Sequence, residues 1–152
     1  MCVIINMAAV IFICNHDGID LSAFPVLLNW CDNTAACCWV NHKCKYSLIG
    51  QRLGQFFVRL LMGTNIGIQA EWISTHLNFI ADDISRLKIE NESYDFDYKS
   101  LTKTYPILRD CRQFQPSDTL LGMIWDIVLH NACPDPLIVK QLEPAALGRI
   151  IS

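Results

Sequence analysis

The feature that most constrains this chain is a short apolar run that ends on a carboxylate. Residues 26–31 read Val-Leu-Leu-Asn-Trp-Cys, with Pro25 before them and Asp32 directly after them. Such a run predicts a central β-strand that is hydrophobic on both faces. Open α/β sheets bind their ligands at the carboxyl ends of the strands, and Asp32 falls at that end. We therefore expect Asp32 either to be solvated or to belong to a site.

Composition limits the classes of function. The 152 residues suit one domain, or a small domain with an appendage. With a net charge of −3, the chain as a whole has no basic surface for nucleic acid, so such binding would need a local patch or a metal ion. The apolar residues 1–14 have no basic segment before them and are too short to span a bilayer. They predict a buried helix and no membrane partner, and they suggest that the chain begins late within a domain.

Cysteine spacing gives no metal motif. The sharpest candidate is Cys37-Cys38 with His42 and Cys44, but adjacent cysteines on a helix point to different sides and make a poor zinc cage. No Cys-x-x-Cys pair occurs, and most cysteines lie in apolar runs. We interpret them as buried free thiols, which predicts a reducing intracellular compartment, the cytoplasm or the nucleus.

Hydrophobic periodicity predicts an α/β layer followed by a helical tail. The predicted elements are a helix over 2–14, a strand over 26–31, a helix over 35–61 that breaks around 42–46 and is closed by Gly63, a strand over 66–72, and a helix over 79–87 capped by Asn78. This alternation predicts a parallel pair of strands. Residues 89–104 are mostly acidic and predict a linker. Residues 105–152 predict a helical extension, with helices over 116–131 and 137–142, that docks on residues 1–88 or on a neighbouring polypeptide.

Three aspartates are the candidates for chemistry. Asp32 at a strand end and Asp82-Asp83 at a helix start are separated by one βα unit, so both could face the same edge of the sheet. Carboxylates on rigid elements suit Mg²⁺, and two such ions would clamp a scissile phosphate. On spacing alone the simpler interpretation is that Asp32 caps or borders the next helix and Asp82-Asp83 complement a helix dipole.

Two segments resemble a known family. Residues 32–41 read Asp-Asn-Thr-Ala-Ala-Cys-Cys-Trp-Val-Asn, and residues 72–86 read Trp-Ile-Ser-Thr-His-Leu-Asn-Phe-Ile-Ala-Asp-Asp-Ile-Ser-Arg. In order and spacing they resemble two motifs of the RNase H-like domain of retrotransposon reverse transcriptases, closest to DIRS-type elements that carry a tyrosine recombinase. The resemblance covers roughly residues 1–88, and residues 105–117 look like the extension that follows in such elements.

The resemblance implies a partial RNase H-like fold (helix-strand-helix-strand-helix) whose intact relatives cleave RNA in RNA/DNA hybrids with two Mg²⁺ ions. It implies that Asp32 and Asp82 match two catalytic metal ligands. Asn78 and Arg86 match framework positions, whereas Asp83 is a bystander. Trp72 and Thr75 depart from the family's His and Gly, and His76 falls at a variable position that predicts a surface loop. The candidate nucleic-acid contacts are Asn33, Arg52, Arg59, Asn78 and Arg86, with Lys43 and Lys45 as further possible phosphate contacts, although a solvated helix face explains the basic residues more simply.

The family's first strands and two of its four metal-binding carboxylates have no counterpart, because no Asp or Glu precedes Asp17. We therefore expect a truncated copy that is inactive alone, with an exposed sheet edge and apolar face. Its expected partner is the remaining reverse transcriptase polypeptide. Two alternatives stay open: a non-catalytic remnant of the fold, or an unrelated small protein-interaction domain. In-frame codons for the missing carboxylates upstream of Met1 would favour the first interpretation, and stop codons there would favour the remnant.

Overall fold

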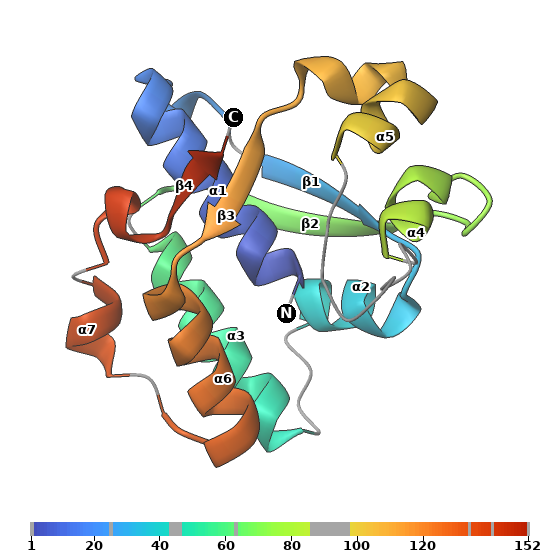
Figure 1. The fold of residues 1–152 in the computed structure, drawn as a ribbon. Helices are drawn as coiled ribbons and strands as arrows, with labels where there is room; N and C mark the ends of the chain where they lie inside the picture. Colours follow the sequence, from blue (N-terminus) through green and yellow to red (C-terminus); the bar gives the residue numbers. More distant parts are fainter. Residues whose placement is uncertain are drawn as a thin grey trace.

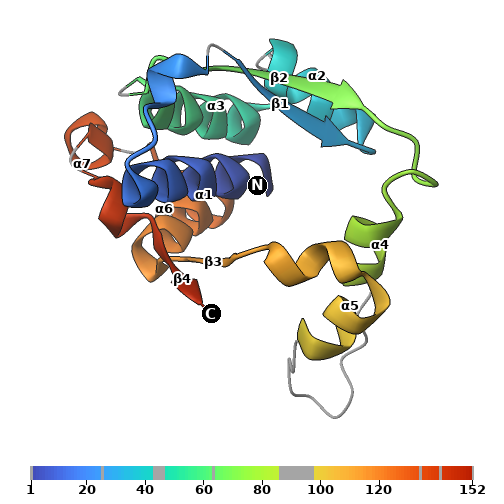
Figure 2. The same ribbon diagram turned by 90° about the horizontal axis from the view of Figure 1, so that it is seen from above.

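The computed structural model describes residues 2–24, 26–42, 47–62, 64–85, 98–133, 135–140 and 142–151. Its helices are α1 (Cys2–Asp17), α2 (Thr34–His42), α3 (Leu48–Leu61), α4 (Phe79–Ser85), α5 (Tyr98–Thr104), α6 (Asp118–His130) and α7 (Pro136–Lys140). Its strands are β1 (Val26–Cys31), β2 (Gly67–Trp72), β3 (Gln113–Pro116) and β4 (Gly148–Ile151). Helix α1 lies centrally, with α3 and the β1–β2 sheet on one side and α6 on the other (Figures 1 and 2). The chain is thus a mixed α/β protein.

Strands β1 and β2 form a parallel pair, as the alternation of elements predicts. Their register runs from Val26 opposite Gly67 to Cys31 opposite Trp72, and α2 and α3 make the crossover between them. Helix α2 lies against β2 and is tied to it by one side chain: Asn41 donates to the Ala70 carbonyl oxygen (2.8 Å) and accepts from the Ala70 N–H (2.9 Å). These bonds satisfy the N–H and C=O of Ala70, which point away from β1 and pair with no strand among the described residues.

The prediction that β1 is buried on both faces is wrong. Its residues alternate between exposed and half-buried, and Val26, Leu28 and Trp30 are 54%, 46% and 63% exposed. Leu27 and Cys31, on the opposite face, pack against the core. A run of apolar residues does not distinguish a strand between two layers from a strand with only one covered face, because both keep the same local pattern.

Local sequence signals set the helix ends. Ser47 caps α3 by accepting from the Gly50 N–H (3.2 Å), and Ser117 caps α6 by accepting from the Leu120 N–H (3.1 Å). Helix α6 ends where Asn131 takes a left-handed conformation (φ 53°), which Asn tolerates better than most residues. The prediction that Gly63 closes α3 concerns a position outside the described residues.

One core crosses the predicted boundary between residues 1–88 and 105–152. It joins side chains of α1, α3 and α6 that are almost fully buried: Ile4, Met7, Phe56, Phe57, Leu120, Ile124 and Ile127. Helix α1 also contacts β3 and β4, and α3 contacts α6 and α7. The C-terminal part therefore docks on the first part, one of the two arrangements that the sequence predicts.

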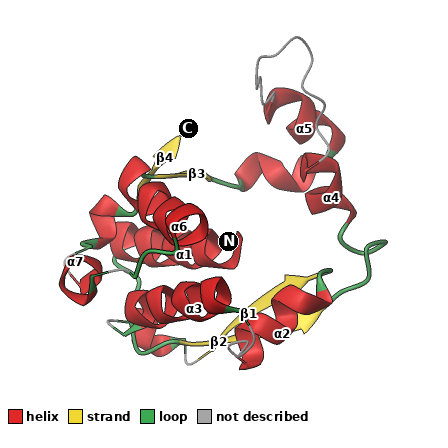
Figure 3. Cartoon of the chain, turned by 90° about the horizontal axis from the view of Figure 1, so that it is seen from below, coloured by secondary structure: helices red, strands yellow, loops and turns green. Residues whose placement is uncertain are grey.

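The segment after residue 88 differs from prediction in two respects. The predicted linker over 89–104 contains helix α5, and its residues 89–97 lie outside the described part of the chain. The predicted helical extension also holds an antiparallel pair, β3 with β4, in which Gln113 lies opposite Ile151 (Figure 3). Strands of four residues show too little alternation to be predicted, and their pairing joins distant parts of the chain. No helix within the described residues is both long and apolar enough to cross a membrane.

Candidate active site at the carboxyl end of the parallel sheet

Asp32 follows β1 directly, and the backbone around it is fixed to β2. The Ile73 N–H donates to the Cys31 carbonyl oxygen (3.1 Å), which extends the parallel ladder by one bond. The Trp72 indole N–H donates to the Asp32 carbonyl oxygen (3.1 Å). Two adjacent carbonyls at the end of β1 are therefore held by the end of β2, which gives Asp32 a rigid backbone at the edge where α/β sheets place their ligands.

The helix after Asp32 is capped by its neighbour. Asn33 accepts from the Ala36 N–H through its side-chain oxygen (3.0 Å), and its backbone carbonyl accepts from the Cys37 N–H (3.0 Å). Asp32 therefore borders α2 without capping it, and the Asn33 side-chain oxygen is already engaged in the cap. Within the described residues, no hydrogen bond or ion pair of the Asp32 carboxylate is found.

A buried thiol lies beside Asp32. The Cys37 thiol donates to the Cys31 carbonyl oxygen (3.5 Å), and the Cys31 sulfur accepts from the Asn33 N–H (3.4 Å). Burial raises the pKa of Cys37, and the neighbouring Cys31 and Asp32 raise it further. Since the thiolate is the nucleophilic form, Cys37 is poorly suited to covalent catalysis and serves as packing at this end of α2.

The second candidate carboxylate is positioned by α4. Residues 74–78 form a turn in which the Leu77 N–H donates to the Ser74 carbonyl oxygen (2.9 Å), and α4 follows. Asp82 lies in the first turn of α4, and its N–H donates to the Asn78 carbonyl oxygen (3.0 Å). His76 is exposed in this turn, which confirms the predicted surface histidine.

Tyr105 contacts two side chains of α4. The Tyr105 hydroxyl donates to the Asp83 carboxylate, and the rings of Tyr105 and Phe79 lie 5.9 Å apart between centroids. The Asp83 carboxylate raises the pKa of Tyr105 by accepting from its hydroxyl. Figure 2 shows α4 beside α5 and apart from the β1–β2 sheet. Asp83 therefore has a structural role in holding α4, and sequence spacing gave no signal of its partner 22 residues away. Its expected lack of a catalytic role stays a prediction.

Asp32 lies in the connection after β1, and Asp82 lies in helix α4, which follows the connection after β2. Both connections leave the same end of the parallel sheet. Among the residues that the structure describes, no group of three or more His, Cys, Asp or Glu side chains is placed to hold a metal ion. Mg²⁺ takes six oxygen ligands in near-octahedral geometry, so two carboxylates would leave most positions to water or substrate. Their role as metal ligands stays a prediction.

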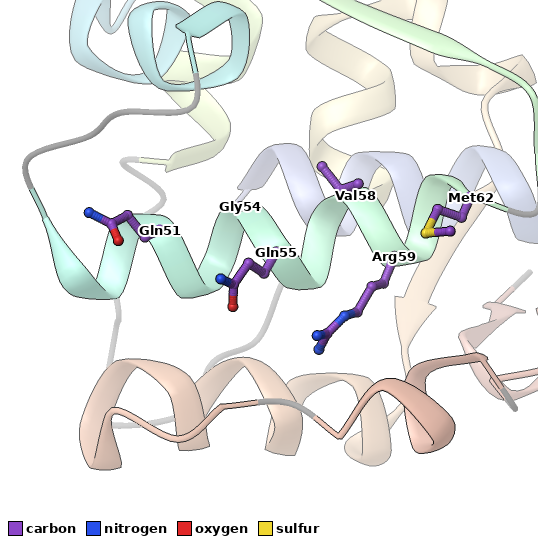
Figure 4. A pocket seen from close by; sticks show the side chains of 6 residues that line it. All are labelled: Gln51, Gly54, Gln55, Val58, Arg59 and Met62. Carbon is purple, nitrogen blue, oxygen red and sulfur yellow. The ribbon is translucent and has the colours of Figure 1, made fainter.

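The candidate nucleic-acid contacts divide between two places. Asn33 and Asn78 lie in the connections at the carboxyl end of the sheet, whereas Arg52 and Arg59 lie on α3, which packs against α6 and α7. Arg59 lines a cavity of about 440 Å³ and extends away from the α3 axis (Figure 4). The other lining residues are Gln51, Gly54, Gln55, Val58 and Met62. Arg86, Lys43 and Lys45 lie outside the described residues.

The cysteines are less buried than predicted. Among the six cysteines whose side chains the structure describes, Cys37 alone is buried, Cys14 and Cys31 are half-buried, and Cys38, Cys111 and Cys133 are exposed. The exposure of each cysteine depends on which face of its helix or strand it occupies. Apolar neighbours along the sequence do not show which face that is. Cys44, the last ligand of the candidate zinc group, lies outside the described residues.

Comparisons with known proteins add no relative. No protein family model matches this chain, and no match was found among curated proteins or solved structures. The described elements define a mixed α/β protein with a parallel βαβ unit. Asp32 lies at the carboxyl end of this unit, where the Trp72 indole N–H binds its backbone carbonyl.

Proposed function

We propose that this chain is the C-terminal part of a retroelement reverse transcriptase RNase H-like domain that does not cleave nucleic acid by itself. In this proposal Asp32 and Asp82 are metal ligands for Mg²⁺, and the substrate of the completed domain is an RNA/DNA hybrid. The remaining reverse transcriptase polypeptide supplies the other carboxylates.

The observation that carries the proposal is the position of Asp32. The motif that resembles the family begins at this residue, and the residue follows a strand of a parallel βαβ unit with its carboxylate unengaged within the described residues. The second motif spans the end of β2 and helix α4, so the order helix, strand, helix, strand, helix agrees with the resemblance. Two carboxylates hold a catalytic metal weakly and position the attacking water poorly, which is why we expect no cleavage by this chain alone.

The test compares this chain with a version extended by the translated codons upstream of Met1. On a labelled RNA/DNA hybrid with Mg²⁺ or Mn²⁺, we expect no cleavage by the chain alone and cleavage of the RNA strand by the extended protein. Asp32→Asn and Asp82→Asn should abolish that cleavage, because each removes a charged metal ligand.

Asp83→Asn is the matched control, because it changes a neighbouring aspartate and keeps an acceptor for the Tyr105 hydroxyl. We expect this variant of the extended protein to cleave the hybrid. If the chain alone cleaves the hybrid and its Asp32→Asn variant does not, the proposal that the chain is inactive by itself is wrong. An extended protein that carries the upstream carboxylates and remains inactive would refute the family assignment.

A non-catalytic interaction domain is the second candidate. It is favoured by the exposed apolar face of β1, since large exposed apolar side chains gathered on one strand are typical of interaction surfaces. In that case Asp32→Asn would leave every property of the extended protein unchanged.

A further inference from the structure

The outer side of β1 carries backbone groups that pair with no strand in the described part of the chain. In the described part of the chain β1 pairs with β2 alone. Cys31 directs its carbonyl oxygen toward β2, where it accepts from the Ile73 N–H (3.1 Å). Because the N–H and C=O groups of successive strand residues point to alternate sides, those of Val26, Leu28 and Trp30 point away from β2. Figure 2 looks onto this side of β1, and no other element crosses it.

The two outer edges of the sheet differ. On the outer edge of β2, the Asn41 side chain engages both the N–H and the C=O of Ala70. On the outer edge of β1 no such bond occurs among the described residues, and the strand holds no charge, proline or glycine within residues 26–31. Soluble proteins usually protect an edge strand with one of these devices or with a covering element. An apolar, uncharged edge is instead suited to pairing with another strand.

The sequence of β1 is complementary to itself about Leu28. If two copies of the strand ran antiparallel with Leu28 opposite Leu28, Val26 of each copy would lie opposite Trp30 of the other. All three outward-facing residues of each strand would then form hydrogen-bonded pairs, about six bonds in total. Pairs of an aliphatic with an aromatic side chain are among those that stabilise neighbouring strands.

Repulsion within the pair of Asp32 carboxylates or within the pair of Glu71 carboxylates does not oppose this pairing. The nearest acidic residues in sequence, the two Asp32 carboxylates, would lie eight residue steps apart along the strands, or about 27 Å. Glu71 lies on β2, opposite Trp30. The two β2 strands would be three strand spacings apart, so their Glu71 side chains would be separated by about 14 Å or more. Both separations exceed the screening length of about 8 Å at physiological salt.

We propose that β1 is a self-association site, at which two copies of this chain pair antiparallel through Val26, Leu28 and Trp30 to form a four-stranded sheet in the order β2-β1-β1-β2. The contact is isologous, so it closes after two copies. One strand edge buries less than the roughly 800 Å² per partner of a standard interface, so the dimer is weak and depends on concentration. The proposal does not depend on any catalytic role of Asp32.

Sedimentation velocity over a hundred-fold range of concentration tests the proposal. We expect the wild-type chain to shift from monomer toward dimer as concentration rises. Leu28→Lys and Trp30→Lys place a charge at the pairing edge and should each keep the chain monomeric over the whole range. Circular dichroism confirms that each variant is folded, and two separate positions guard against loss of one variant to misfolding.

Met62→Lys is the matched control, because Met62 is also apolar and is 76% exposed, but lies beyond the end of α3. It should dimerise like the wild type. Amide hydrogen exchange gives a second readout, since the N–H groups of Val26, Leu28 and Trp30 should exchange more slowly at high concentration. A chain that stays monomeric throughout, or a dimer that both lysine variants preserve, would overturn the proposal. Protection of these amides by an added upstream polypeptide, in a chain that does not self-associate, would assign the edge to that polypeptide instead.

Discussion

Removing the Asn41 side chain should destabilise the parallel sheet by a predictable amount. Asn41 reaches from α2 to the outer edge of β2 and makes two hydrogen bonds with the backbone of Ala70, at 2.8 and 2.9 Å. Ala70 itself is buried. Asn41→Ala therefore leaves one N–H and one C=O of a buried residue without their partners.

The magnitude follows from these two bonds. Each contributes about 1 kcal/mol net, so their combined loss amounts to about 2 kcal/mol. Asn41 is exposed, so water reaches part of the vacated space and lowers the cost. We expect the free energy of unfolding to fall by about 1–2 kcal/mol, which corresponds to a decrease in Tm of roughly 2–8 °C for a domain of this size.

The assay is equilibrium urea unfolding followed by circular dichroism. Asn6→Ala is the control, because Asn6 is an exposed asparagine on α1 and its loss should change the free energy of unfolding by less than about 0.5 kcal/mol. If Asn41→Ala changes the unfolding free energy no more than Asn6→Ala does, the two bonds do not hold α2 on the sheet. The assignment of Asn41 as the group that occupies the β2 edge would then be wrong.

Three other predictions address the rest of the fold. Ile124→Ala removes a fully buried side chain from α6 and should lower the free energy of unfolding by about 2–5 kcal/mol in one cooperative transition; two separate transitions by calorimetry would show that residues 1–88 and 105–152 unfold independently. Hydrogen bonds from Arg112 lower the pKa of Asp17. The pair therefore stabilises the fold fully above the pKa of an unfolded Asp, about 3.9, and this stability is lost as the pH falls through the lower pKa of the folded state. In Arg112→Gln, urea unfolding should show a smaller loss of stability on acidification. Gly148→Ala should lower Tm, because a methyl group there would overlap the Gln115 carbonyl oxygen and the Phe114 ring, whereas Gly122→Ala, on α6 with open space around it, should not lower it.

Local pattern in the sequence was enough to identify most of the elements that carry the candidate site. The parallel pair β1–β2 and helices α1, α2, α3, α4 and α6 all fall where periodicity and capping residues predict them. These signals are local: Ser47 and Ser117 engage N–H groups three residues ahead, so a short stretch of chain contains all the information that is needed. The position of Asp32 at the end of β1 follows from the apolar run that directly precedes it.

What the sequence could not decide depends on contacts between distant residues. Whether both faces of β1 are covered depends on which layers surround it, and the same apolar run is compatible with either arrangement. The β3–β4 pair and the bond between Asp83 and Tyr105 each join segments separated by more than twenty residues, and no short-range pattern encodes them.

The sequence by itself thus determined the α/β class, the parallel βαβ unit and the carboxylate at its end, because strand and helix periodicity and capping act over a few residues. Only the tertiary structure decided that the N-terminal and C-terminal parts share one core, and which face of β1 packs against that core. These properties are set by which surfaces meet when the chain packs, and that is a property of the whole molecule.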